Sequence, residues 1–124
     1  LGKVKIPIYN LAAREDHIAP AKSVFEGCQY FGGDVQYVLG GSGHIAGVVN
    51  PAGKAKYQYW TGAKPSGRLE DWIAGATEHP GSWWPHWQAW LDGMVPEKVP
   101  AREPGGGVVT PIEDAPGSYV RARS

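Results

Sequence analysis

Two side chains suited to proton transfer lie in loops of this 124-residue sequence. His44 lies in "GGSGH", directly after the apolar run "DVQYVL", and Asp16 lies in "REDHIAP", after an earlier apolar run. A carboxylate that accepts one imidazole N–H fixes the tautomer of the ring and leaves the other nitrogen free to take a proton from a nucleophile. Taken singly, a lone histidine is more often structural, and an aspartate in a polar loop is usually a turn residue. Taken together, the two are candidates for the acid and the base of a catalytic site.

The segments around these loops predict the elements that position them. Apolar alternation predicts a strand over residues 3–12 and another over residues 34–39, and a one-sided apolar pattern predicts a helix over residues 21–30. A strand, a helix-length crossover and a second strand are typical of a parallel βαβ unit. Ligand chemistry in such sheets gathers at the carboxyl ends of the strands, where both loops fall.

The character of the sequence changes after Pro51. Ser66 is a candidate cap for a helix beginning near Leu69, and Ser82 for the helix "SWWPHWQAWLDG", with Gly93 as its terminator. The Pro/Gly-rich stretch over residues 96–117 predicts an irregular tail. We therefore divide the chain into a βαβ unit that carries the Asp and His loops, residues 1–51, and a helical, Trp-rich extension with its tail, residues 52–124.

The nucleophile of a catalytic triad is missing from the sequence. Ser42 does not fit the nucleophile elbow G-x-S-x-G, because His44 stands where that motif needs glycine and no obvious helix follows. Cys28 lies on the apolar face of a predicted helix and is interpreted as a small core residue. Glycines at 40, 41 and 43 predict a sharp turn that returns the His44 ring over the sheet edge. An aspartate loop followed by a histidine loop matches the chain order of α/β-hydrolase triads, so we expect the nucleophile upstream.

Composition excludes several classes of function. Lys and Arg total 12, as do Asp and Glu, so net charge supports neither nucleic-acid nor anionic-membrane binding. One cysteine excludes an internal disulfide and a Cys-based zinc site, and favours a reducing compartment. No signal peptide and no membrane-spanning apolar run is evident. The sequence starts without Met in a strand-like run, so we expect it to be part of a longer protein.

Four separated segments, "AAREDHIAP", "VLGGSGHIAGVVNP", "EHPGSWWPHWQAWL" and "PGSYVRARS", resemble in order the C-terminal end of polyhydroxyalkanoate synthases, particularly those of class I. The resemblance covers nearly the whole chain. It implies the last strands of a parallel sheet in an α/β-hydrolase fold, with helices and an irregular C-terminal tail. One departure is Ala21, where the pattern of the family has Trp.

The resemblance implies an acyltransferase that polymerises 3-hydroxyacyl-CoA, such as 3-hydroxybutyryl-CoA, through a Cys, Asp and His triad. Asp16 takes the position of the catalytic aspartate, and His44 takes that of the general base for the cysteine thiol. Whether Asp16 orients His44 or activates the substrate hydroxyl is left open. The cysteine elbow is absent from this sequence, so we expect the isolated chain to be inactive.

The resemblance also implies partners and a location. We expect 3-hydroxyacyl-CoA and the growing polyester as partners, a homodimeric full-length enzyme, and a cytoplasmic location at polyester granules. We predict neither a cofactor nor a metal site, because the coenzyme A thioester is itself the substrate. No nucleic acid and no transmembrane segment are expected.

A run without acidic residues contains the cations Lys54 and Lys56. A solvated basic loop is the ordinary interpretation, and a guide for the phosphates of coenzyme A is the functional one. Two alternatives to the synthase are kept. One is the end of a generic α/β-hydrolase acting on esters or thioesters, and the other is a Trp-rich binding module without catalytic activity.

Overall fold

The structure is a computed structural model, and it describes residues 1–54, 56–103 and 105–123. The contacts divide the chain into two compact units, Leu1–Met94 and Val95–Ser124. The first unit contains the sheet and both candidate catalytic loops, and the second contains most of the Pro/Gly-rich tail.

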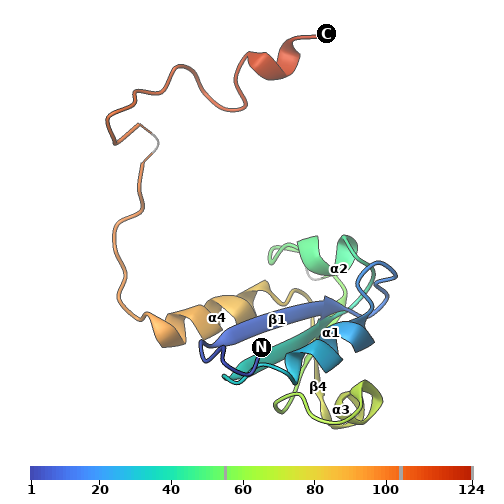
Figure 1. Ribbon diagram of the computed structural model, residues 1–124. Helices are drawn as coiled ribbons and strands as arrows, with labels where there is room; N and C mark the ends of the chain where they lie inside the picture. Colours follow the sequence, from blue (N-terminus) through green and yellow to red (C-terminus); the bar gives the residue numbers. More distant parts are fainter. Residues whose placement is uncertain (55, 104, 124) are drawn as a thin grey trace. The chain divides into compact units, whose positions relative to one another are not determined.

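Four strands form one mixed sheet in the order β1-β2-β3-β4 (Figure 1). The strands are β1 (Ile8–Ala13), β2 (Val35–Gly40), β3 (Gln58–Thr61) and β4 (Thr77–Pro80). Strands β1 and β2 are parallel, with Ile8 opposite Val35 and Ala13 opposite Gly40. Their crossover is the helix α1 (Ala21–Cys28). The predicted βαβ unit is therefore confirmed, with β1 starting later than predicted.

The prediction of a parallel sheet is wrong beyond β2. Strand β3 is antiparallel to β2, and β4 is antiparallel to β3. Residues from 52 onward, predicted to be helical, thus supply two strands as well as helices. Each of these strands has four residues, which is too short for an alternating pattern to stand out in the sequence. The division of the chain at residue 51 stays a prediction.

One face of the sheet carries the main core, beneath α1 and α3 (Leu69–Gly75). Phe25 from α1 and Tyr37 from β2 are fully buried, and their ring centroids lie 5.2 Å apart in an edge-on contact. Trp72 of α3 contacts Tyr37 with centroids 4.9 Å apart. Burial of each of these aromatic side chains contributes about 1.5–3 kcal/mol, so this cluster holds both helices to the sheet. Ala21, the departure from the family pattern, is buried at the start of α1.

The other face of the sheet carries Tyr9, because successive side chains of a strand point to opposite faces. Tyr9 packs edge-on against Trp90 of α4 (Trp84–Met94), with ring centroids 5.4 Å apart. The predicted cap of this helix is confirmed: the Ser82 hydroxyl oxygen accepts the Trp84 N–H at 3.2 Å. The helix continues through the predicted terminator, Gly93, to Met94.

The predicted Ser66 cap of α3 is wrong. The residue before this helix is Arg68, which makes no capping hydrogen bond through its side chain. Glu70 and Asp71 lie in the first turn instead, where negative charge is favourable next to the free backbone N–H groups.

The second unit is Val95–Ser124, and its described residues, 95–103 and 105–123, are irregular apart from a short 3-10 helix over Tyr119–Arg121, as the Pro/Gly-rich sequence predicts. Glu113 organises the turn before this helix, because its Oε1 accepts both the N–H and the hydroxyl of Ser118, at 2.7 and 2.8 Å. Across the described parts of both units, no helix has the length and apolar character needed to cross a bilayer.

Candidate active site

The loops that follow β1 and β2 run side by side at the carboxyl ends of the two parallel strands. The Arg14 N–H donates to the Gly40 carbonyl at 2.8 Å, and the Glu15 N–H donates to the Ser42 carbonyl at 3.0 Å. The short helix α2 (Ala46–Val49) comes after the second loop and lies near the ends of β1 and β2 (Figure 1). Parallel pairing therefore places two loops that are distant in sequence next to one another.

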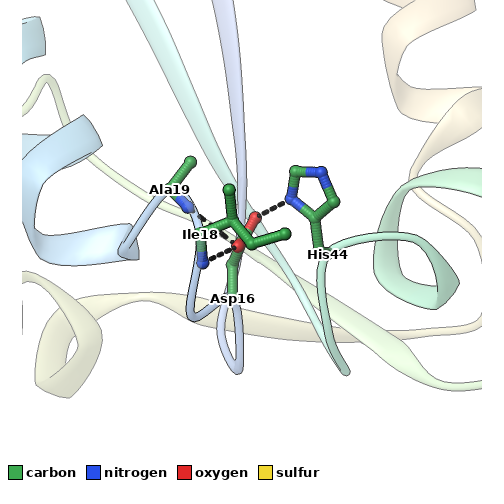
Figure 2. Close-up of polar contacts among 4 residues, drawn as sticks. All are labelled: Asp16, Ile18, Ala19 and His44. Atoms are coloured by element: carbon green, nitrogen blue, oxygen red, sulfur yellow. Dashed lines mark hydrogen bonds and ion pairs between the residues drawn. The ribbon is translucent and has the colours of Figure 1, made fainter.

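Asp16 and His44 meet between these loops, as Figure 2 shows. The Nδ1 atom of His44 lies 2.7 Å from Oδ2 of Asp16. The other oxygen, Oδ1, accepts the backbone N–H groups of Ile18 and Ala19, at 2.8 and 2.9 Å. The side chain of Asp16 is 6% exposed, whereas that of His44 is 45% exposed. The carboxylate is thus enclosed and hydrogen-bonded through both oxygens, and the imidazole is accessible to a reacting group.

Hydrogen bonds determine the protonation of the pair. The backbone N–H of Ala19, with hydrogen bonds from His44 and Ile18, holds the pKa of Asp16 at about 2, below its ordinary value of 3.8. At neutral pH, Asp16 is therefore a carboxylate that only accepts hydrogen bonds. Nδ1 of His44 must then carry the proton in this contact. In the neutral ring, Nε2 is left unprotonated and able to accept a proton.

The turn that carries His44 differs in detail from the predicted one. None of the glycines at 40, 41 and 43 has a left-handed backbone; the left-handed residue is Ser42, with φ of 67°. Two of the glycines serve close approach instead. A Cβ atom on Gly41 would lie 2.9 Å from the Gln58 carbonyl oxygen, and one on Gly40 would lie 3.1 Å from the Gly47 carbonyl oxygen. The glycines thus let β3 and α2 pack tightly against the end of β2.

Neither nucleophile candidate gains support from its surroundings. Cys28 is 2% exposed within the core, and burial raises the pKa of its thiol, which disfavours the reactive thiolate. The helix α2 begins four residues after Ser42, so the expectation that no helix follows is wrong. That helix has only four residues, and His44 still occupies the motif position that needs glycine.

Lys54 and Lys56 line a hollow of about 270 Å³ beside the His44 loop. Its apolar part comes from the two residues after His44, from the end of α2 and from the segment beyond this helix. The full lining is Ile45, Ala46, Val49, Asn50, Pro51, Lys54, Lys56 and Tyr57. Tyr57 is absent from the sequence-based candidates, since no sequence signal marks a tyrosine that lines this hollow. Within the described part of the chain, no group of three or more His, Cys, Asp or Glu side chains could hold a metal ion.

No family model matches the sequence. Curated relatives do match it. The chain is 63% identical over its whole length to a poly(3-hydroxyalkanoate) polymerase of Methylorubrum extorquens, and covers 21% of that protein. It is also 63% identical over its whole length to the poly(3-hydroxyalkanoate) polymerase subunit PhaC of Rhizobium meliloti, covering 20% of it. A third relative is the poly(3-hydroxyalkanoate) polymerase subunit PhaC of Cupriavidus necator. It is 42% identical to the chain over the whole chain, which covers 21% of that protein. The chain thus spans about a fifth of the length of these relatives.

Proposed function

Because the chain belongs by sequence to the poly(3-hydroxyalkanoate) polymerase family, we propose that it supplies the general base and its aspartate partner to an acyltransferase that polymerises 3-hydroxyacyl-CoA with release of coenzyme A. The observation that carries this proposal is the 2.7 Å contact between His44 Nδ1 and the enclosed carboxylate of Asp16. The finer assignment of the four-stranded sheet to the end of an α/β-hydrolase fold is part of the same proposal, and rests on the parallel β1-α1-β2 unit.

His44 acts through its free nitrogen. Nε2 takes the proton of a cysteine thiol located outside this chain, and the thiolate attacks the thioester carbonyl of the substrate. A bond forms between the cysteine sulfur and the acyl carbon, the bond from that carbon to the sulfur of coenzyme A breaks, and the proton passes to the departing thiolate. The 3-hydroxyl of one acyl unit then attacks the carbonyl carbon of another acyl thioester. The new carbon–oxygen bond gives the polyester linkage, the bond from that carbon to the thioester sulfur breaks, and the departing thiolate receives the hydroxyl proton by way of His44. His44 accepts the hydroxyl proton in that step.

The surroundings of Asp16 support an orienting role. Both of its oxygens already accept hydrogen bonds, from His44 and from two backbone N–H groups. A carboxylate with a pKa of about 2 is also a poor base for a hydroxyl near neutral pH. We therefore propose that Asp16 holds the His44 ring and its tautomer, and that it stabilises the imidazolium formed during proton transfer.

The hollow lined by Lys54 and Lys56 is the proposed entrance for the substrate. Two ammonium groups beside an apolar surface suit a ligand with phosphate groups at one end and an apolar portion at the other, as coenzyme A thioesters have. A homodimeric enzyme and attachment to polyester granules belong to the proposal as well. Because no reactive thiol lies in the described core, the chain by itself is proposed to be inactive.

The test uses a polymerase that carries this chain as its matching segment. His44→Ala should lower the rate of coenzyme A release from 3-hydroxybutyryl-CoA by roughly two to four orders of magnitude, the scale for a lost general base. The matched control is His17→Ala, because His17 is an exposed histidine in the Asp16 loop and should be dispensable. A folded His44→Ala enzyme with near-normal thiol release would refute the proposed role of His44.

A further inference from the structure

The backbone on both sides of His44 is held by α2, the short helix that follows it. The Gly47 N–H of α2 donates to the carbonyl of Gly43, directly before His44, at 2.9 Å. Two further N–H groups of this helix donate to the carbonyl of Ile45, directly after His44, at 3.1 and 2.9 Å. The position of the imidazole therefore depends on the position of α2.

Helix α2 has little means of holding its own position. It contains four residues, and a helix of that length is unstable in isolation because nucleation costs more than so few hydrogen bonds return. No side chain caps its start, and its buried residue is Gly47, which has no side chain to pack. Other elements of the fold must therefore keep α2 in place.

Three side chains at the start of α4 hold the end of α2. The Nε1–H groups of Trp83 and Trp84 both donate to the Val48 carbonyl, at 3.1 and 3.0 Å, and one carbonyl oxygen can accept two such bonds. The Ser82 hydroxyl donates to the Asn50 carbonyl, just after α2, at 2.6 Å. Carbonyls at the end of a helix have no partner within it, so these side chains supply the missing donors. We call residues 82–84 the anchor segment.

The anchor segment is itself fixed to the sheet. It follows β4 after one residue, Gly81, whose N–H donates to the carbonyl of Tyr57, directly before β3, at 2.9 Å. The Trp83 ring also contacts Tyr9 of β1, with centroids 6.1 Å apart. Strands on both sides of the sheet thus hold the donors that hold α2.

The histidine needs such support. Its ring is 45% exposed, so few neighbours restrict it by packing, and its contact with Asp16 is a single hydrogen bond at Nδ1. One bond leaves the ring free to turn about that contact unless the backbone beside it is fixed. Proton transfer is sensitive to direction, because misplacement of a reacting group by about 1 Å can cost about a hundredfold in rate.

We propose that the anchor segment positions His44: its side chains hold the carbonyls at the end of α2 and so fix the direction of Nε2. The inference rests on the proposed role of His44 as general base, and it assigns the anchor segment no contact with the reacting atoms. Because Trp83 and Trp84 share one acceptor, either indole should keep α2 in place when the other is lost.

A double-mutant cycle in a polymerase that carries this chain tests the inference, since Phe in place of Trp keeps an aromatic ring and removes the N–H. Trp83→Phe and Trp84→Phe should each lower kcat for coenzyme A release only a few-fold. The double variant should lower it roughly tenfold to a hundredfold, more than the product of the single effects and with a smaller change in KM. The thermal unfolding midpoint shows whether each variant is folded.

The matched control is Trp87→Phe, on the same helix. The Trp87 ring packs against both indoles, with centroids 6.2 Å from Trp83 and 6.4 Å from Trp84. This substitution removes an indole N–H from the same cluster and leaves both donors to α2 in place, so kcat should be unchanged. A loss of kcat equal to that of the double variant would show that packing of the rings, and not the shared carbonyl, is what matters, and would overturn the inference.

Ser82 supplies an independent test, which also decides if the double variant does not fold. Ser82→Ala removes the donor to the Asn50 carbonyl and should lower kcat, whereas Ser82→Thr keeps a hydroxyl and should retain it. The hydroxyl also caps α4, so a residue with that role alone would change the unfolding midpoint and leave kcat unaffected. Unchanged kcat in Ser82→Ala, or an equal loss in both variants, would contradict the inference.

Three outcomes of the double-mutant cycle would also overturn the inference: effects of the two indoles that simply multiply, a folded double variant with unchanged kcat, or one altered only in KM. The last would show that α4 shapes the hollow beside α2 and does not direct His44. His44→Ala is measured in parallel. If it is inactive while the double variant is normal, only the positioning role fails, and if it is active, the proposed function fails.

Discussion

His44 Nδ1 and Asp16 Oδ2 lie 2.7 Å apart although 28 positions separate the two residues in the chain. The register of β1 against β2 produces this contact, because it places Ala13 opposite Gly40 and so starts both loops at the same level of the sheet. The aspartate is enclosed and the histidine is exposed, as the proposed roles of an orienting group and a reacting group require. Substitutions in this pair and in the elements that support it should therefore have different effects on activity and on stability.

Replacing Asp16 with Asn should preserve the loop but slow turnover. The amide oxygen can still accept the N–H groups of Ile18 and Ala19, whereas the amide NH₂ would donate to Nδ1 and favour the wrong imidazole tautomer. We expect kcat for coenzyme A release to fall by roughly two to four orders of magnitude. The thermal unfolding midpoint, measured alongside, shows whether the fold is kept. An unchanged kcat would show that Asp16 is an ordinary turn residue and does not orient His44.

The low pKa of Asp16 predicts a specific acid dependence of stability. The pKa is lowered from 3.8 to about 2 in the folded chain, so the folded state binds a proton less readily than the unfolded state. The contribution of Asp16 is therefore fully present above about pH 4 and is lost as the pH falls toward 2. The denaturant midpoint of a protein that carries this chain, compared with that of its Asp16→Asn variant, should show a difference that narrows across this interval. A difference independent of pH would contradict the assigned pKa.

His86 predicts a second pH dependence, near neutrality. Its Nδ1 lies 3.0 Å from the Tyr9 hydroxyl, and burial, with the nearby His79, lowers the pKa of His86 below 6.5. The folded state thus favours the neutral ring, so the contribution is present above pH 6.5 and is lost as the pH falls through the folded pKa. His86→Gln should flatten the pH dependence of the denaturant midpoint between about pH 7.5 and 5. The same dependence in wild type and variant would show that another group is responsible.

Cys28→Ser should leave acyl-enzyme formation intact. The thiol is 2% exposed in the core, and burial raises its pKa, so both observations disfavour Cys28 as the nucleophile of the proposed reaction. Placing a hydroxyl there should lower the free energy of unfolding by about 1 kcal/mol. Labelling by radioactive acyl-CoA measures the acyl-enzyme, and denaturant titration measures stability. A folded variant that no longer forms the acyl-enzyme would identify Cys28 as the nucleophile.

Two neighbouring glycines should differ in their tolerance of a side chain. Gly41→Ala would place Cβ 2.9 Å from the Gln58 carbonyl oxygen, so β3 must shift from β2, and the free energy of unfolding should fall by about 1–3 kcal/mol. Gly43→Ala is the matched control, because the nearest atom to its Cβ would be the Glu15 carbonyl oxygen, at an ordinary contact distance of 3.8 Å. Equal stability of the two variants would show that close approach does not explain the glycine at 41.

The sequence alone predicted the elements whose pattern is local. The β1-α1-β2 unit, the Ser82 cap and the irregular tail were readable because each depends on the order of apolar, capping or Pro/Gly residues within a short window. The same order placed Asp16 and His44 after successive strands, which was enough to pair them as candidates. The resemblance to polyhydroxyalkanoate synthases came from four such local segments, and the curated relatives confirm it.

Only the tertiary structure decided the features that depend on residues far apart in the chain. Strands β3 and β4 have four residues each. They are stable as strands because β2 supplies an edge for β3 and β3 supplies one for β4, which no local pattern encodes. The left-handed backbones of Ser42 and Tyr57 are likewise held by partners at Glu15 and Gly81. The protonation of Asp16 depends on backbone N–H groups aimed at one oxygen and on an imidazole from another loop. Residue types determined which chemistry was available, and the folded backbone determined which atoms meet, because hydrogen bonds act only over about 3 Å.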